Sequence, residues 1–175
     1  MDNDMKELFT KYADYNQLMN ANIISAMDSL GYDRVIKNQF SFFPSIFATM
    51  NHIMVGDLIW LNRFSRLKNF EALGLLDDFI KPTKLDQSIT DNLTSYQEYR
   101  VVLDKLIIDF IAECDEKDFI SDLNYTNTSG KKFSKNFGLL ISHFFNHQTH
   151  HRGQVSTLLN QNKINIGMTD FLQVV

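Results

Sequence analysis

Apolar residues recur at steps of three and four along four long segments of this chain, and that spacing gathers them on one face of a helix. The segments span residues 5–30, 44–67, 93–114 and 135–161. Gly31 follows the first segment as a C-terminal stop, and Pro44 suits the first turn of the second. The second segment is apolar around most of its circumference, which indicates burial on several sides. The pattern predicts an all-α fold, a four-helix bundle with long connections.

The connections between these segments carry nearly all of the turn-forming residues. Residues 74–92 are long for a link between helices and have room for a short helix. The polar stretch 124–132 predicts a small hairpin that turns near Ser129 and Gly130. Residues 162–175 show no clear pattern, and we expect a tail packed across the helices. No repeat or linker divides the chain, so residues 1–175 are expected to form a single domain.

Charge and composition exclude several classes of partner. The net charge is −4, and the nearest approach to a basic stripe is Lys131 and Lys132 beside Lys135, so nucleic acid is not expected as a partner. No apolar run reaches the roughly 20 residues that span a bilayer, and the N-terminal residues lack the pattern of a secretory signal. Cys114 is the only cysteine, which excludes an internal disulfide and fits a reducing compartment. A cytoplasmic protein without membrane contact is expected.

Four of the five histidines fall within nine residues of the last predicted helix, namely His143, His147, His150 and His151. Histidines four residues apart share a helix face about 6 Å apart along the axis, so two such imidazoles can converge on one metal ion. His143 and His151 lie about 12 Å apart along the axis and cannot share an ion. His147 is therefore the common member of either pair.

The direction of the core selects between these pairs. At about 100° per residue, His151 lies roughly 40° and His147 roughly 80° from the centre of the apolar face, whereas His143 and His150 lie more than about 120° away. The remaining histidine, His52, sits midway along the buried second helix, where a metal ion would satisfy its ring. The alternatives are a hydrogen-bonded core histidine at position 52 and a merely polar face on the last helix. Three imidazoles suit zinc, nickel, copper or iron.

Two motifs carry a resemblance to a known family. The segment HFFNHQTHHRGQVSTLL, residues 143–159, contains a histidine, three residues and then His-Arg-Gly-Gln. The segment NHIMVGDLIWLNRF, residues 51–64, places a histidine before an Asp and a Trp-Leu pair. Together they resemble the DinB-like (DinB/YfiT) family of helical metalloproteins, over nearly the whole chain and in the order of all four helices.

The resemblance implies that His52, His147 and His151 bind a divalent metal ion, with nickel or zinc foremost. It implies a cytoplasmic four-helix bundle, a homodimer, and a small-molecule substrate handled with a low-molecular-weight thiol. Family members include thiol-dependent transferases and proposed hydrolases, so a metal-dependent enzyme of one of these types is expected. No residue is assigned a catalytic role. The alternatives are a metal-binding stress-response protein without turnover and an interaction module whose histidines bind nothing.

Other residues of the two motifs have expected supporting roles. Arg152 points away from the ligand pair, where it would anchor a carboxylate or a neighbouring helix. Gly153 is expected to allow close helix packing, because glycine inside a helix costs about 1 kcal/mol. Gln154 is placed to hydrogen-bond a ligand or a metal-bound water, and His143 and Asp57 are further candidates for support around the metal.

Overall fold

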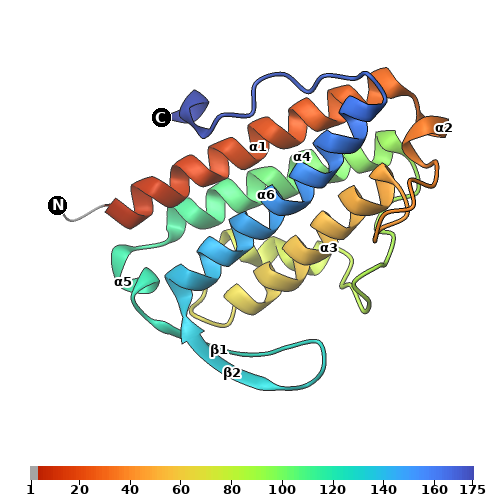
Figure 1. Ribbon diagram of the computed structural model, residues 1–175. Coiled ribbons are helices and arrows are strands. Elements are labelled where there is room, and N and C mark those ends of the chain that lie inside the picture. Colours follow the sequence, from red (N-terminus) through yellow and green to blue (C-terminus); the bar gives the residue numbers. More distant parts are fainter. Residues whose placement is uncertain (1–3) are drawn as a thin grey trace.

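The computed structural model describes residues 4–175 and is mostly helical, which confirms the predicted helical class. Four long helices run alongside one another (Figure 1). They are α1 (Asp4–Leu30), α3 (Ile46–Phe64), α4 (Leu93–Glu113) and α6 (Phe137–Gln161). Helix α1 contacts both α4 and α6, and α6 also contacts α3. Each of the four corresponds to one of the segments with helical periodicity.

Short elements occupy the connections. They are α2 (Tyr32–Val35), η1 (Ala72–Asp78), α5 (Glu116–Phe119), β1 (Asp122–Thr126), β2 (Lys132–Asn136) and η2 (Phe171–Val174). Strands β1 and β2 form an antiparallel hairpin with Gly130 at φ 82° in its turn, so the predicted hairpin is confirmed. The hairpin lies at the opposite end of the molecule from α2 (Figure 1). Helix α6 begins two residues later than expected, because Lys135 pairs with Leu123 in the sheet.

Side-chain caps and a glycine set where the long helices begin and end. Ser45, Asn92 and Asn136 each accept a hydrogen bond from the backbone N–H three residues later, at the starts of α3, α4 and α6. Gly31 follows the last residue of α1 at φ 86°, a left-handed conformation that glycine adopts without strain. These local signals fix the end of α1 and the starts of α3, α4 and α6, and so place α3 and α6, the helices that carry the candidate site.

The segment after α6 returns along α1 (Figure 1). The Tyr15 hydroxyl donates to the Thr169 carbonyl at 2.6 Å. The Phe171 ring lies 4.8 Å from the ring of Tyr12 and 5.4 Å from that of Tyr15, measured between centroids. Aromatic contacts at these separations add to the burial of apolar surface. The expectation of a tail packed across the helices is confirmed.

A buried polar network joins all four long helices. Asp57 of α3 forms an ion pair with the fully buried Arg100 of α4, and Gln148 of α6 donates to Asp57 at 2.6 Å. Asp104, one turn beyond Arg100, accepts from two asparagines of α1, Asn16 and Asn20, at 3.0 and 2.9 Å. Arg152 of α6 donates to the same two asparagines. Buried charges require such partners, so the network fixes how the helices pack.

Over residues 4–175, no helix combines the length and the apolar character that crossing a membrane requires.

Candidate metal centre

Three histidines from two helices converge where α3 packs against α6. His52 comes from α3, and His147 and His151 lie one turn apart on α6. One ring nitrogen from each histidine lies within 4.8 Å of the other two. The Nε2 atoms of His52 and His147 are 3.2 Å apart, although 95 residues separate them in the chain. The structure therefore brings together the three histidines singled out from the sequence.

Hydrogen bonds on the far side of two rings fix which nitrogen faces the cluster. His52 donates from Nδ1 to the Leu85 carbonyl at 2.8 Å, which leaves Nε2 of the neutral ring with a free lone pair. His151 pairs through Nδ1 with Oε1 of Gln154 at 2.8 Å, one turn along α6. The Gln154 amide nitrogen lies 3.3 Å from Nε2 of His150, which orients its oxygen toward His151. Metal-binding histidines usually have such a partner on the second nitrogen.

The spacing of one pair of ring nitrogens fits a tetrahedral ion. Two nitrogens that each lie about 2.0–2.1 Å from such an ion are about 3.3 Å apart. The Nε2 atoms of His52 and His147 are 3.2 Å apart, close to that value. Two lone pairs that face each other at this distance repel unless a proton or a cation lies between them. The donor set, three imidazole nitrogens, matches the ligands of zinc and related divalent ions.

Burial favours the neutral form of all three rings. Desolvation lowers the pKa of His52 and of His151 below the ordinary histidine value. It lowers the pKa of His147 to about 3, with a smaller contribution from the neighbouring histidines. Metal ions bind only the deprotonated nitrogen, so rings that are neutral near pH 7 need lose no proton on binding.

Two packing features of the cluster involve residues that the sequence did not single out. The Phe43 ring stacks on His52 at 4.0 Å between centroids and meets His151 edge-on at 5.6 Å. A Cβ atom at Gly56 would lie 2.7 Å from Cε1 of His147, so only glycine leaves room for that ring. In the sequence, Gly56 interrupts the apolar second segment without an evident reason, and that glycine was the one sign of a close approach at this position.

The expected role of Gly153 in close helix packing is wrong. Gly153 is exposed, and a Cβ atom there would meet nothing within 4 Å. It lies on the outer side of α6, because the neighbouring Arg152 turns inward to reach Asn16 and Asn20 of α1. That contact is the anchoring of a neighbouring helix expected of Arg152.

The remaining candidates lie around the cluster at different depths. Gln154 contacts His151 directly, as described above. Asp57 is fully buried in the polar network. His143 is exposed, with its ring 5.1 Å from Trp60 and 6.3 Å from His147 between centroids. Within residues 4–175, no hydrogen bond joins Asp57 or His143 to the three converging histidines.

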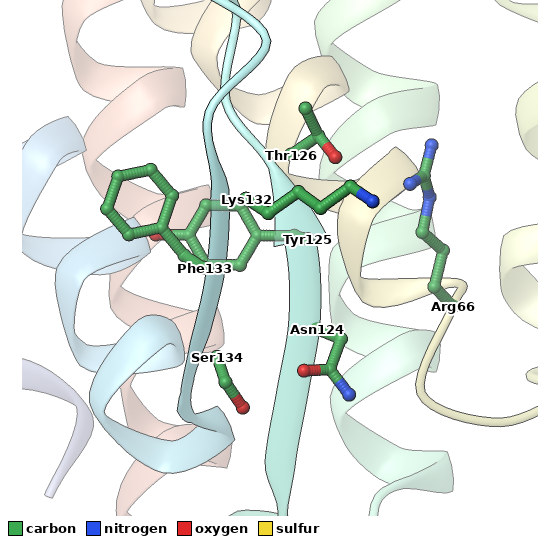
Figure 2. A pocket seen from close by; sticks show the side chains of 7 residues that line it. All are labelled: Arg66, Asn124, Tyr125, Thr126, Lys132, Phe133 and Ser134. Atoms are coloured by element: carbon green, nitrogen blue, oxygen red, sulfur yellow. The ribbon is translucent and has the colours of Figure 1, made fainter.

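A pocket of about 500 Å³ opens over two of the three histidines. Its walls include the rings of His52 and His151, with Phe42, Phe43 and Leu85 around them. A second hollow of about 530 Å³ lies at the hairpin, where residues of β1 and β2 and the side chain of Arg66 line it (Figure 2). Within the part of the chain described, the hairpin hollow has no histidine, cysteine or carboxylate in its walls. Of these two hollows, only the first is lined by metal-binding groups from the part of the chain that the structure describes.

Two comparisons with known proteins find matches over most of the chain. Protein DinB of Bacillus subtilis (strain 168) is 24% identical over 167 residues, which cover 95% of this chain and 93% of that protein. No solved structure gives a significant match to the chain. The family model described as DinB family matches residues 1–173, nearly the whole sequence. The chain belongs to the DinB family.

Proposed function

We propose that His52, His147 and His151 bind one divalent metal ion, nickel or zinc foremost, and that the protein is a metal-dependent enzyme. The observation that carries the proposal is the convergence of three imidazoles, with one ring nitrogen of each within 4.8 Å of the others and with the His52–His147 pair at the edge length of a tetrahedral site. The family resemblance supports the same ligands and favours a thiol-dependent transferase or a hydrolase. The four long helices would then form the four-helix bundle typical of the family.

An open coordination position supports catalysis over a purely structural role. Structural zinc sites usually have four protein ligands, whereas catalytic sites have three and leave one position for water or substrate. Across residues 4–175, no carboxylate or thiol joins the three histidines within ligand distance. A metal ion bound by three neutral imidazoles supplies a Lewis acid that lowers the pKa of a bound water or thiol toward neutrality.

The surrounding residues would orient the ligands and limit access of water. The Leu85 carbonyl and the Gln154 side chain hold the rings of His52 and His151 in the required tautomers. Phe43 covers one face of His52, so a substrate would approach through the adjoining pocket. These contacts preorganise the ligands before any metal binds.

The alternative is a metal-binding protein without turnover, in which the ion mainly ties α3 to α6. The direct approach of His52 on α3 to His147 on α6 favours this reading. The two readings differ in whether solvent can reach the ion. A metal-loaded protein with no exchangeable coordination position would support the structural role.

Metal content measured by plasma mass spectrometry on untagged protein tests the proposed ligands. After incubation with zinc or nickel, the wild type should bind about one equivalent and His52→Ala much less. His143→Ala is the matched control, because His143 lies one turn from His147 but outside the converging group. Equal metal content in the wild type and His52→Ala would refute the three-histidine site.

A cobalt-substituted sample then separates the enzyme from the structural alternative. Changes in its visible spectrum on addition of a small thiol would support the open site, and an unchanged spectrum would support a closed one. The homodimer and the cytoplasmic location remain proposals that rest on the family resemblance. A monomeric mass by light scattering at micromolar concentration would contradict the dimer.

A further inference from the structure

Basic side chains gather around two adjoining hollows at the hairpin, although the whole chain has a net charge of −4. Arg66 and Lys132 line the hollow of about 530 Å³, and Figure 2 shows the Lys132 side chain extending toward the guanidinium group of Arg66. Arg63, Arg66 and Lys81 line the second hollow, of about 230 Å³. Arg66 and Thr126 line both, so the two hollows meet at these side chains.

The basic side chains have few partners of opposite charge. Within residues 4–175, no Asp or Glu lines either hollow. Over the same residues, Arg63, Arg66 and Lys132 form no ion pair. Lys81 pairs with Asp77 at 2.8 Å, but both side chains are largely exposed, and a surface pair of this kind adds little. An anion bound among these cations would therefore relieve their mutual repulsion.

Two aromatic rings hold the guanidinium group of Arg63 in place. Its Cζ atom lies 4.5 Å from the centroid of the Trp60 ring and 5.2 Å from that of the Tyr125 ring. Rings at such distances attract a cation and limit its movement. Burial, with a smaller contribution from the charge of Arg66, lowers the pKa of Arg63. An anion would thus meet a cation that is already positioned and partly shielded from water.

The hairpin adds neutral hydrogen-bonding groups on one of its faces. Side chains alternate between the two faces of a strand, and directly paired residues of neighbouring strands share a face. Asn124 pairs with Ser134, and Thr126 pairs with Lys132, so these four side chains lie on one face. All four line the larger hollow. An amide and two hydroxyl groups beside Lys132 and Arg66 suit the oxygens of a phosphate group.

We propose that the two hollows at the hairpin bind a small molecule that carries two linked phosphate groups, with diphosphate as the simplest example. Arg66 contacts both groups, because it lines both hollows. Lys132 binds one group together with the polar face of the hairpin, and Arg63 binds the other. The fork of an arginine matches the oxygens of a phosphate in two parallel hydrogen bonds. The site is separate from the proposed metal centre, since none of its three histidines lines either hollow.

Backbone amide signals in NMR spectra locate the binding of diphosphate and of inorganic phosphate. Each is added at constant ionic strength to the full-length protein after removal of metal, because phosphate groups also bind metal ions. We expect saturable shifts around residues 59–66 and 124–134. Diphosphate should bind at least about tenfold more tightly than phosphate, because its second group engages the second hollow. Shifts confined to other regions, equal affinities, or no saturation at millimolar diphosphate overturn the inference.

Two lysines of β2 provide a matched pair of variants. Lys132→Gln should weaken diphosphate binding about fivefold, since it removes a cation from the larger hollow. Lys135→Gln removes the same charge from the opposite face of the strand, where Lys135 lines neither hollow, and should leave the affinity unchanged. Arg66→Gln should weaken binding at least about tenfold. Equal losses in the two lysine variants would indicate attraction by overall charge and contradict the assigned site.

A short single-stranded oligonucleotide tests the competing class of ligand. Any basic surface attracts its chain of phosphates. Weaker binding of the oligonucleotide than of diphosphate supports a small-molecule site. Tighter binding that increases with the length of the oligonucleotide would assign the surface to nucleic acid and overturn the inference.

Discussion

Replacement of Gly56 by alanine tests whether the close approach of α3 to the His147 ring determines metal affinity. The added Cβ atom would lie 2.7 Å from Cε1 of His147. Carbon atoms in van der Waals contact are about 3.5–4.0 Å apart, so the ring must retreat by roughly 0.8–1.3 Å. Metal sites tolerate displacements of only about 0.2 Å in ligand distance. The variant should therefore lose metal affinity while it keeps its fold.

The expected loss is about 10- to 100-fold in metal affinity, the range seen when support around a ligand is disturbed. That loss corresponds to about 1.4–2.7 kcal/mol of binding free energy. The stability of the metal-free protein should change less. Alanine favours the helix by about 1 kcal/mol over glycine, which offsets part of the overpacking cost of about 1–3 kcal/mol.

Competition with a chromophoric zinc chelator measures the affinity, and thermal unfolding of the metal-free protein measures the stability. Gly153→Ala is the matched control, a second glycine in a helix, two residues after the ligand His151. A Cβ atom there meets no other atom within 4 Å, so the change should stabilise the fold by up to about 1 kcal/mol and leave zinc affinity unchanged. Wild-type zinc affinity in Gly56→Ala would refute the reasoning.

Three further results are expected. In urea titrations, the metal-free fold should lose about 1–2 kcal/mol of stability between pH 7 and pH 5. The pKa of His147 is 6.5 in the unfolded chain and about 3 in the folded protein, so over this pH range protons bind the unfolded chain and favour unfolding. Asp57→Asn should cost about 2–4 kcal/mol in the same assay by weakening the buried pair with Arg100, whereas Asp77→Asn on the surface should leave the midpoint unchanged. Cys114 is buried with its pKa raised by burial to about 12, so a thiol reagent at pH 8 should label it only as fast as the protein opens.

Periodicity revealed the long helices because apolar residues at helical spacing are buried, on one face in α1, α4 and α6 and on most sides in α3. The same geometry oriented the histidines. The angle of His147 and His151 to the apolar face selected the pair that meets His52 in the structure. Gly31 marked the end of α1 and the polar stretch 124–132 marked the hairpin, since both signals are local. Features determined within one element could therefore be predicted from the sequence.

Features that depend on contacts between distant segments could not be predicted. The Leu85 carbonyl reaches His52 from a loop 33 residues away, and nothing in its own residue type indicates that role. Asp57 pairs with Arg100 across 43 residues, and several other acids in the sequence could have partnered that arginine equally well. Gly56 and Gly153 could not be ranked, because a glycine that makes room for a ring and one that faces solvent look alike without a tertiary structure.

The buried polar network has a consequence for how α6 can move. Apolar side chains can exchange similar neighbours if a helix slides by one turn, about 5.4 Å, but Gln148 would then lose Asp57 and Arg152 would lose Asn16. Gln148 and Arg152 each directly follow one of the two converging histidines of α6. The buried hydrogen bonds of Gln148 and Arg152, about 100° around the helix from the histidines, therefore set the height and rotation of both imidazoles. Any change in the spacing of the three histidines would have to begin in the core, out of reach of solvent.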